Sequence, residues 1–381
     1  MRELKMMALL KKTWNICTWI LFTIGFVGCV LMLWSKIWLS VNRHLLEKPT
    51  ATAQSLKPVT PRPDTRIHPE FIQNLNNQMA NSMSSDSISS MAYDPKNDFL
   101  LVGRESGAID IWDGKQAHAR REIKAHKMPA SQLSFSSDGR VFFSNSYFED
   151  VTHVWDAASG SLVHTITSSR GPVVETSDPN LFVIASSLGL RIFNLTTKEV
   201  LPDTYRQVGD VVTALAYDVP TDQLAIGTAS GGVELWRLLK VPAPTLKRIA
   251  AAKPYATGNW VKAVLFFDSG RVVYSLPQRG NLDEWSVPRL EPLRSREISL
   301  GFVASSVFIP EKGGLAMVGF RKGDNDAASS FLETFNLNDG SESLVDLNVS
   351  GSGVIVYLPS LSTIIAGKRT SISVIDISKA R

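Results

Sequence analysis

The stretch that decides the fold runs from Ala125 to Ile166 and reads AHKMPASQLSFSSDGRVFFSNSYFEDVTHVWDAASGSLVHTI. It contains four short runs in which apolar side chains recur with period two, and turn residues separate these runs. The pair Asp138-Gly139 lies between the first two runs, where a tight hairpin turn needs a residue with positive φ. The stretch therefore predicts four antiparallel strands, placed around Leu133 and Phe135, at 141–143, from Val151 to Trp155 and from Leu162 to Ile166.

The end of the third run, an aromatic or aliphatic residue followed by a polar one, recurs along the chain. Successive spacings are 43, 38, 43, 49, 50 and 40 residues, close to the ~40–45 residues of a four-stranded propeller blade. A glycine precedes the tryptophan by five residues at Gly107, Gly231 and Gly280, which suggests one repeated turn without room for a side chain. The recurring segments are IDIWD (109–113), THVWD (152–156), LRIFN (190–194), VELWR (233–237), LDEWS (282–286), LETFN (332–336) and ISVID (372–376).

These motifs resemble the WD40 family of β-propellers. His126, the turn Asp138-Gly139 and the closing pair Trp155-Asp156 match the order and spacing of that family over one full repeat, and weaker units cover roughly residues 70–381. The resemblance implies an all-β, seven-bladed propeller that serves as an interaction platform. Its structural repeat positions in this chain would be Trp112, Asp113, His126, Asp138, Gly139, Trp155, Asp156, Trp236 and Trp285.

The family's polar network is only partly represented in this sequence. In the family, a histidine, a serine or threonine, the tryptophan and a tight-turn aspartate bond to one another. Only the second repeat has the histidine, and Glu149-Asp150 replaces its usual Asp-Gly turn. Gly209-Asp210 and Gly258-Asn259 stand at the histidine position of the fourth and fifth repeats. We therefore expect a diverged propeller held together by apolar packing between blades.

The last unit ends after three strands. Propellers of this family commonly complete such a blade with a strand from before the first repeat, which removes an exposed sheet edge. The segment Phe71–Leu75 is our candidate for this strand. The count is then seven blades, with six or eight as alternatives because the third and sixth units are irregular.

The first 66 residues differ in composition from the rest. Residues 13–33 contain no Asp, Glu, Lys, Arg or His and are long enough to span a ~30 Å hydrocarbon core. Four tryptophans, Trp14, Trp19, Trp34 and Trp38, lie near its ends as interfacial residues do. The sequence predicts a basic tail (1–12), a transmembrane helix (13–40) that contacts the lipid bilayer, a proline-rich spacer (41–66) and a propeller (67–381). Basic residues before the helix favour a cytoplasmic N-terminus. The propeller would then face the periplasm from a bacterial inner membrane, with the opposite orientation as the alternative.

Two processing motifs are alternatives to a retained anchor. Ala51-Thr52-Ala53 resembles a signal-peptidase site but lies well beyond the apolar run. Phe26-Val27-Gly28-Cys29 resembles a bacterial lipoprotein box, yet the residues after Cys29 are still apolar. We expect neither site to be used. The only other cysteine, Cys17, lies in the same apolar stretch, so the propeller can hold no disulfide.

The charges argue against nucleic-acid binding. Residues 1–66 carry ten Lys and Arg against three Asp and Glu, which leaves 30 against 33 for residues 67–381 out of totals of 40 and 36. The propeller therefore lacks the net positive field that would attract a phosphate backbone. Basic residues do cluster locally, and they are the candidate partner-binding residues: Arg120, Arg121, Lys124, Lys127, Arg321 and Lys322.

No catalytic set, metal site or cofactor site emerges from the residues. None of the six histidines pairs with another at a convincing metal-ligand spacing. The sequence therefore favours a non-catalytic, membrane-tethered scaffold that binds protein partners, as a subunit or assembly factor of a membrane protein complex. The alternative is an enzymatic or cofactor-binding propeller of the quinone-dehydrogenase or lactonase kind, which would need polar residues converging on the central channel.

Overall fold

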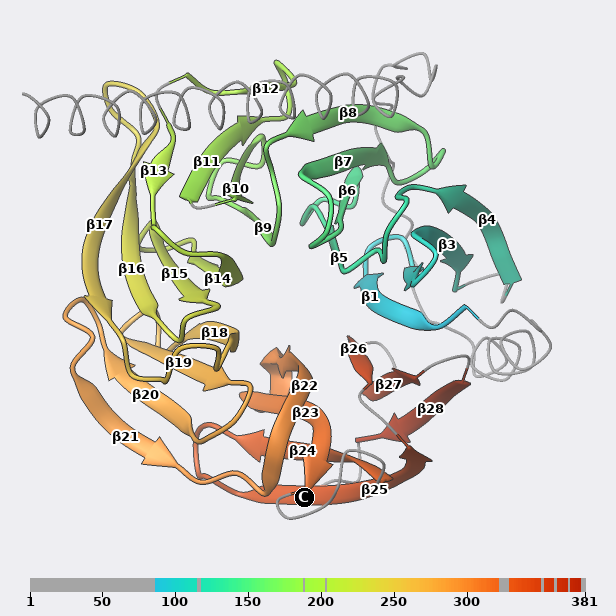
Figure 1. Ribbon diagram of the computed structural model, residues 1–381, viewed down its shortest axis with the longest axis vertical. Coiled ribbons are helices and arrows are strands. Elements are labelled where there is room, and N and C mark those ends of the chain that lie inside the picture. The colour runs from blue at the N-terminus through green and yellow to red at the C-terminus, as the bar shows by residue number, and fades with distance from the viewer. Residues whose placement is uncertain are drawn as a thin grey trace, which may run out of the picture. The chain divides into compact units, whose positions relative to one another are not determined.

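The computed structural model describes residues 86–114, 118–187, 189–202, 204–321, 329–350, 353–359, 362–368 and 371–377. These residues form seven antiparallel sheets arranged in a ring, the seven-bladed propeller that the repeats predict (Figure 1). The candidate closing strand Phe71–Leu75 lies outside the described residues and stays a prediction. The tail (1–12), the helix (13–40) and the spacer (41–66) also lie outside them. In the described part of the chain, no helix is long and apolar enough to cross a membrane.

Each blade is a meander of consecutive strands. Blade 1 contains β1 (Ile88–Asp94), β2 (Phe99–Arg104), β3 (Ala108–Asp113) and β4 (His118–Lys124); blade 2 contains β5 (Gln132–Phe135), β6 (Val141–Asn145), β7 (Val151–Asp156) and β8 (Leu162–Thr167). Blade 3 contains β9 (Val173–Glu175), β10 (Leu181–Ser186), β11 (Gly189–Asn194), β12 (Glu199–Val200) and β13 (Arg206–Gln207); blade 4 contains β14 (Val212–Asp218), β15 (Gln223–Thr228), β16 (Val233–Leu239) and β17 (Thr245–Ala252).

The second half of the ring follows the same order. Blade 5 contains β18 (Val261–Phe267), β19 (Val272–Pro277), β20 (Leu282–Ser286) and β21 (Pro292–Arg296); blade 6 contains β22 (Leu300–Ile309), a 3-10 turn (Pro310–Lys312), β23 (Gly314–Arg321), β24 (Ser329–Asn336) and β25 (Glu342–Ser350). Blade 7 contains β26 (Val354–Leu358), β27 (Thr363–Lys368) and β28 (Ser371–Asp376). The last blade has three strands among the described residues, as the sequence predicts.

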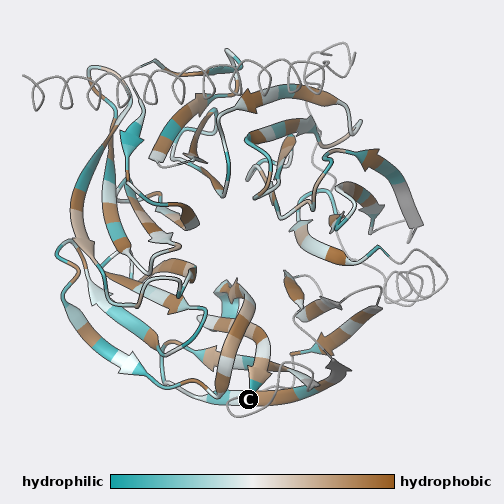
Figure 2. Cartoon of the chain, viewed as in Figure 1, coloured by the Kyte–Doolittle hydropathy of each residue, from teal (hydrophilic) through white to brown (hydrophobic). Residues whose placement is uncertain are grey.

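The recurring motif of the sequence is the third strand of every blade. Phe142 pairs with Trp155 across β6 and β7, and Leu100 pairs with Trp112 across β2 and β3. The turn at Asp138-Gly139 joins β5 to β6, and Gly139 has φ +70°. The apolar positions of the strands recur around the whole ring, whereas the turns are mostly hydrophilic (Figure 2).

Apolar packing joins each blade to the next, because every pair of neighbouring blades shares one buried cluster. The ring closes in the same way: Leu100 and Trp112 of blade 1 pack with Leu358 and Ile365 of blade 7. Burial of such side chains contributes roughly 1.5–3 kcal/mol each. The expectation of a propeller held by apolar contacts between blades is confirmed.

Candidate functional site

The propeller has two faces, which the strand order defines. The first strand of each blade begins at one face, which we call the upper face. The loops between second and third strands also lie there. The lower face carries the turns between first and second strands and between third and fourth strands. Because the strands of every blade are antiparallel, the corresponding turns of all blades lie on the same face, and each face collects residues from distant repeats.

His126 lies on the upper face between blades 1 and 2 and is the centre of a buried network. Its Nε2 is 2.9 Å from Ser144 Oγ, and Trp155 Nε1 donates to the same Oγ at 2.9 Å. Its Nδ1 is 2.7 Å from Glu149 Oε2, and Glu149 Oε1 accepts the backbone N–H of Lys127 at 2.9 Å. Glu149 thus takes the place of the tight-turn aspartate that the family resemblance implies.

The same arrangement recurs in blade 5 with a tyrosine instead of a histidine. Trp285 Nε1 donates to Ser275 Oγ at 2.8 Å, and Tyr255 Oη lies 2.7 Å from that Oγ. The backbone N–H of Tyr255 bonds to Gly231, as that of His126 bonds to Gly107. Tyr255, and not Gly258-Asn259, therefore occupies the histidine position of this repeat, and our assignment from the sequence was wrong. Tyr255 lies five residues (256–260) before β18, as His126 lies five residues (127–131) before β5, so the change of residue type concealed the position.

The other tryptophans of the motif have different partners. Trp236 Nε1 donates to Glu234 at 2.9 Å, and Arg248 lies 5.9 Å from the centre of the Trp236 ring. Trp112 Nε1 is buried without a hydrogen-bond partner in the described part of the chain. A serine hydroxyl that joins the tryptophan to the side chain at the histidine position is thus found in blades 2 and 5 among the blades with a described tryptophan.

The aspartates of the motif stabilise turns. Asp138 Oδ1 accepts Ser136 Oγ at 2.7 Å and the backbone N–H of Arg140 at 3.0 Å, which lowers the pKa of its carboxyl despite burial. Asp156 accepts the backbone N–H and the hydroxyl of Ser159, both at 2.7 Å. Asp113 ends β3 at the equivalent place in blade 1.

The candidate basic residues do not form one patch. Arg121 reaches Ser159 O in a turn of the lower face, whereas Lys127 bonds to the Glu149 loop of the upper face. Lys124 is exposed at the end of β4, and Arg321 is exposed on the upper face, where β23 ends opposite Leu300. The side chain of Arg120 and the whole of Lys322 lie outside what the structure describes. The basic residues that the structure describes therefore do not form a single docking surface.

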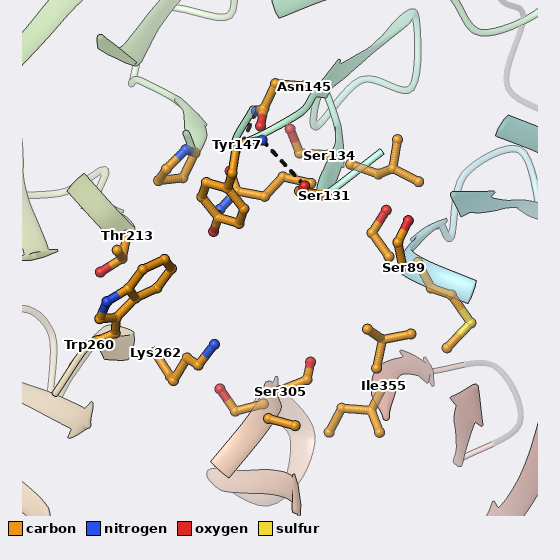
Figure 3. Close-up of a pocket in the computed structure, with 18 of the residues that line it drawn as sticks. Ser89, Ser131, Ser134, Asn145, Tyr147, Thr213, Trp260, Lys262, Ser305 and Ile355 are labelled. Carbon is orange, nitrogen blue, oxygen red and sulfur yellow. Dashed lines mark hydrogen bonds between the residues drawn. The ribbon is translucent and has the colours of Figure 1, made fainter. Parts of the chain in front are cut away.

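A cavity of about 520 Å³ lies at the centre of the ring, lined by the first strands of the blades. Seven serine and threonine residues, among them Ser89, Ser131 and Ser305, line the cavity, and Figure 3 shows these three facing it. Lys262 is the single charged residue among the described residues that line it, and the lining has no carboxylate or imidazole. This composition supplies donors for a bound molecule but no general-base pair.

One side of the cavity wall is aromatic. The Trp260 ring makes an edge contact with the Tyr147 ring at 6.0 Å between centroids, and the Lys262 ammonium lies 5.7 Å from the centre of the Trp260 ring. Burial lowers the pKa of the Lys262 ammonium and raises the pKa of the Tyr147 hydroxyl. Nothing in the repeat pattern identified these residues, because they meet only when the ring closes.

Two large apolar side chains are exposed on the upper face in the loops that adjoin the cavity. Phe148 directly follows Tyr147 in the loop between β6 and β7, and 69% of its surface is accessible. Met128, in the adjoining loop before β5, is 41% accessible. The hydrogen bond from Lys127 N to Glu149 ties these two loops together. Exposed large apolar side chains beside a polar cavity are typical of a protein-binding surface.

In the described residues, no group of three or more His, Cys, Asp and Glu side chains is placed to hold a metal ion. His126 and His153 are neighbours, with ring centroids 4.9 Å apart. Both belong to the network behind Trp155 and not to the cavity. These two histidines are therefore packing residues of blade 2.

Comparisons with known proteins agree with the fold. The crystal structure of the β-propeller domain of Cps50 (Swd1) from Myceliophteria thermophila matches with a TM-score of 0.59 and 19% identity over 78% of this chain and 98% of that chain. At this identity the likeness shows the fold. The chain is therefore a seven-bladed β-propeller.

Sequence relatives include proteins that are named for their WD repeats. Telomerase protein component 1 of Rattus norvegicus is 25% identical over 72% of this chain and 10% of its own length. Dynein assembly factor with WD repeat domains 1 of Xenopus laevis is 32% identical over 19% of this chain and 17% of its own length. No family model matches the chain. Together with the fold, these relatives identify the chain as a WD40-type β-propeller, and the matches span less than a fifth of the length of each of these relatives.

Proposed function

We propose that this chain is a non-catalytic scaffold whose upper face binds a protein partner, and that residues 13–40 hold it at a membrane. The partner would be a component of a membrane protein complex. WD-repeat propellers among the relatives support a role in protein interaction, since one of them is named as an assembly factor for dynein. This support is by analogy, because a fold by itself does not define a function.

The observation that carries the proposal is the exposure of Phe148 and Met128 beside the central cavity. Phe148 belongs to a loop fixed by Glu149 and His126, so the backbone that carries its ring is anchored. An aromatic side chain that is ordered before binding loses little conformational entropy when a partner covers it. The geometry thus favours Phe148 as an anchor for a partner.

The test is co-purification from native membranes in mild detergent. Phe148→Ser is expected to weaken partner capture by about tenfold, the effect of losing an interface anchor worth about 1.4 kcal/mol. Leu293→Ser is the matched control, because Leu293 is 55% accessible on the outer strand β21, away from the upper face. Equal loss in both variants, or no loss in Phe148→Ser, would contradict the proposed docking face.

The membrane tether rests on the apolar segment 13–33 and is tested separately. Removal of residues 1–66 is expected to move the protein from the membrane fraction to the soluble fraction, with the β-sheet circular dichroism spectrum retained. A truncated chain that stays with membranes would show that another element holds it there. Protease protection of intact cells or vesicles tests the orientation, and our proposal expects a propeller that is cleaved only from the extracytoplasmic side.

A further inference from the structure

The central cavity contains a cation without a counter-ion. Lys262 lies on β18, the first strand of blade 5, and its side chain enters the cavity beside Trp260 (Figure 3). Its ammonium contacts the face of the Trp260 ring at 5.7 Å, and no described carboxylate pairs with it. A half-buried ammonium that has lost part of its hydration gains strongly from an anion within hydrogen-bond distance.

A second donor faces the same space from blade 2. Gln132 Nε2 donates to Tyr147 Oη at 2.5 Å, so the proton of that hydroxyl is left to donate elsewhere. It donates to no residue of the described chain. In Figure 3 the Tyr147 hydroxyl and the Lys262 side chain both point into the cavity, on either side of Trp260. One anionic group could accept from both.

A buried acceptor without a partner lies in the same wall. Asn145 is 2% accessible, and its Nδ2 donates to Gly171 O and, at 3.5 Å, to Gln132 Oε1. Since both partners are acceptors, they fix the amide orientation and leave Asn145 Oδ1 facing no donor in the described residues. An unpaired buried acceptor is costly, but this oxygen is not accessible from the cavity, so it makes no direct contact with a ligand there.

We infer that the central cavity binds a carboxylate carried on an extended polypeptide segment, with Lys262 and Tyr147 donating to the carboxylate. This inference rests on the proposed function, since it assigns to the protein partner the chemical group that enters the cavity. The cavity volume of about 520 Å³ lies within the ~300–1,000 Å³ of small-ligand sites. It is therefore large enough for the end or a side chain of such a segment.

The charge of the lining favours a carboxylate over a phosphate. A single ammonium matches one negative charge, whereas a phosphate group carries about −1.5 to −2 at pH 7. No second cation lies among the described lining residues. A dianion would thus be left with about one uncompensated charge in a confined space, which is unfavourable.

Three synthetic pentapeptides titrated into the full-length protein in detergent test the inference. All have the form acetyl-Gly-Ala-X-Ala-Gly. The first has Glu at X and a C-terminal amide, the second has Gln at X and a free C-terminal carboxylate, and the third has Gln at X and an amide. Calorimetry is expected to show binding of one or both acidic peptides, at least about tenfold tighter than the neutral one. The tighter of the two acidic peptides identifies the source of the carboxylate.

Variants locate the binding site. Lys262→Met is expected to abolish the preference for acidic peptides, and Tyr147→Phe to reduce it severalfold. Lys247→Met, on the exposed side of β17, is the control that leaves binding unchanged. Equal affinity of the acidic and neutral peptides for the unaltered protein overturns the inference without recourse to any variant. So does an unchanged preference in Lys262→Met, or tighter binding of inorganic phosphate than of either peptide.

Phe148→Ser separates this inference from the proposed function. Since Phe148 lies outside the cavity, that variant is expected to retain the affinity for the acidic peptide while losing the native partner. Retained partner capture in Phe148→Ser together with carboxylate binding at Lys262 would refute the docking face and support the cavity site. Loss of partner capture in Phe148→Ser, together with no carboxylate binding that depends on Lys262, would refute the cavity site alone.

Discussion

Ser144→Ala is expected to lower the free energy of unfolding by about 3 kcal/mol, because one hydroxyl serves two buried ring nitrogens. Ser144 is fully buried, and its Oγ bonds to His126 Nε2 and Trp155 Nε1, each at 2.9 Å. Alanine fills almost the same space but leaves both nitrogens without a partner. Urea denaturation followed by tryptophan fluorescence measures the change.

Ser186→Ala is the matched control. Ser186 is 4% accessible at the end of β10, and its hydroxyl has no hydrogen-bond partner in the described chain. Replacing an unpaired buried hydroxyl by a methyl group is expected to be neutral or stabilising. A similar loss in the two variants would show that packing, and not the network around His126, determines the cost.

Acid is expected to destabilise blade 2 through His153. Burial lowers the pKa of His153 to about 4, and the charge of His126 adds to this effect while Glu149 opposes it. In the unfolded chain the histidine titrates near its ordinary value of ~6.5. Between these two values the unfolded state binds a proton that the folded state does not, so stability is lost as the pH falls from ~6.5 to ~4.

The expected loss over that range is at most about 3 kcal/mol. His153→Asn removes the titrating group and is expected to flatten this part of the pH profile. The pKa of Glu149 is lowered, so this carboxylate's contribution to stability is lost only as the pH falls below the ordinary carboxyl pKa. That pH range lies below most of the range in which His153 titrates, so the two effects can be told apart. The free energy of unfolding is measured at pH 7 and at pH 4.5 in the unaltered protein and in His153→Asn. An equal change between the two pH values in both proteins would refute this assignment.

The repeat architecture could be predicted because its signals are local. The alternation of apolar residues, the Asp138-Gly139 turn and the recurring third strand each depend on a few neighbouring residues. The seven third strands lie where the sequence predicts them, and the last blade has three described strands. The network at His126 also followed from motif residues, although Glu149 takes part where the family resemblance implies an aspartate.

The proposed binding cavity could not be predicted because it depends on ring closure. Tyr147, Trp260 and Lys262 come from two blades that are more than 100 residues apart, and no spacing rule connects them. Tyr255 was missed because a tyrosine replaces the expected histidine. The glycine five residues before Trp236 was the available signal, since Gly231 accepts the backbone N–H of Tyr255.

The basic residues show a further limit of sequence patterns. Arg121 and Lys127 are close in the chain, yet they lie toward opposite faces because β4 ends between them. Along a strand and the loop that follows it, a cluster in sequence need not be a cluster in space. The exposed apolar residues of the upper face are better candidates for partner binding than these charges.

The measurement that most directly tests the central claim is site-specific photo-cross-linking in native membranes. A photoreactive phenylalanine analogue placed at residue 148 is expected to cross-link a protein partner, whereas the same analogue at residue 293 on β21 is expected to yield little or none. Cross-linking at residue 148 to a discrete protein band would support a scaffold that binds through its upper face. Efficient cross-linking at residue 293 with none at residue 148 would contradict it.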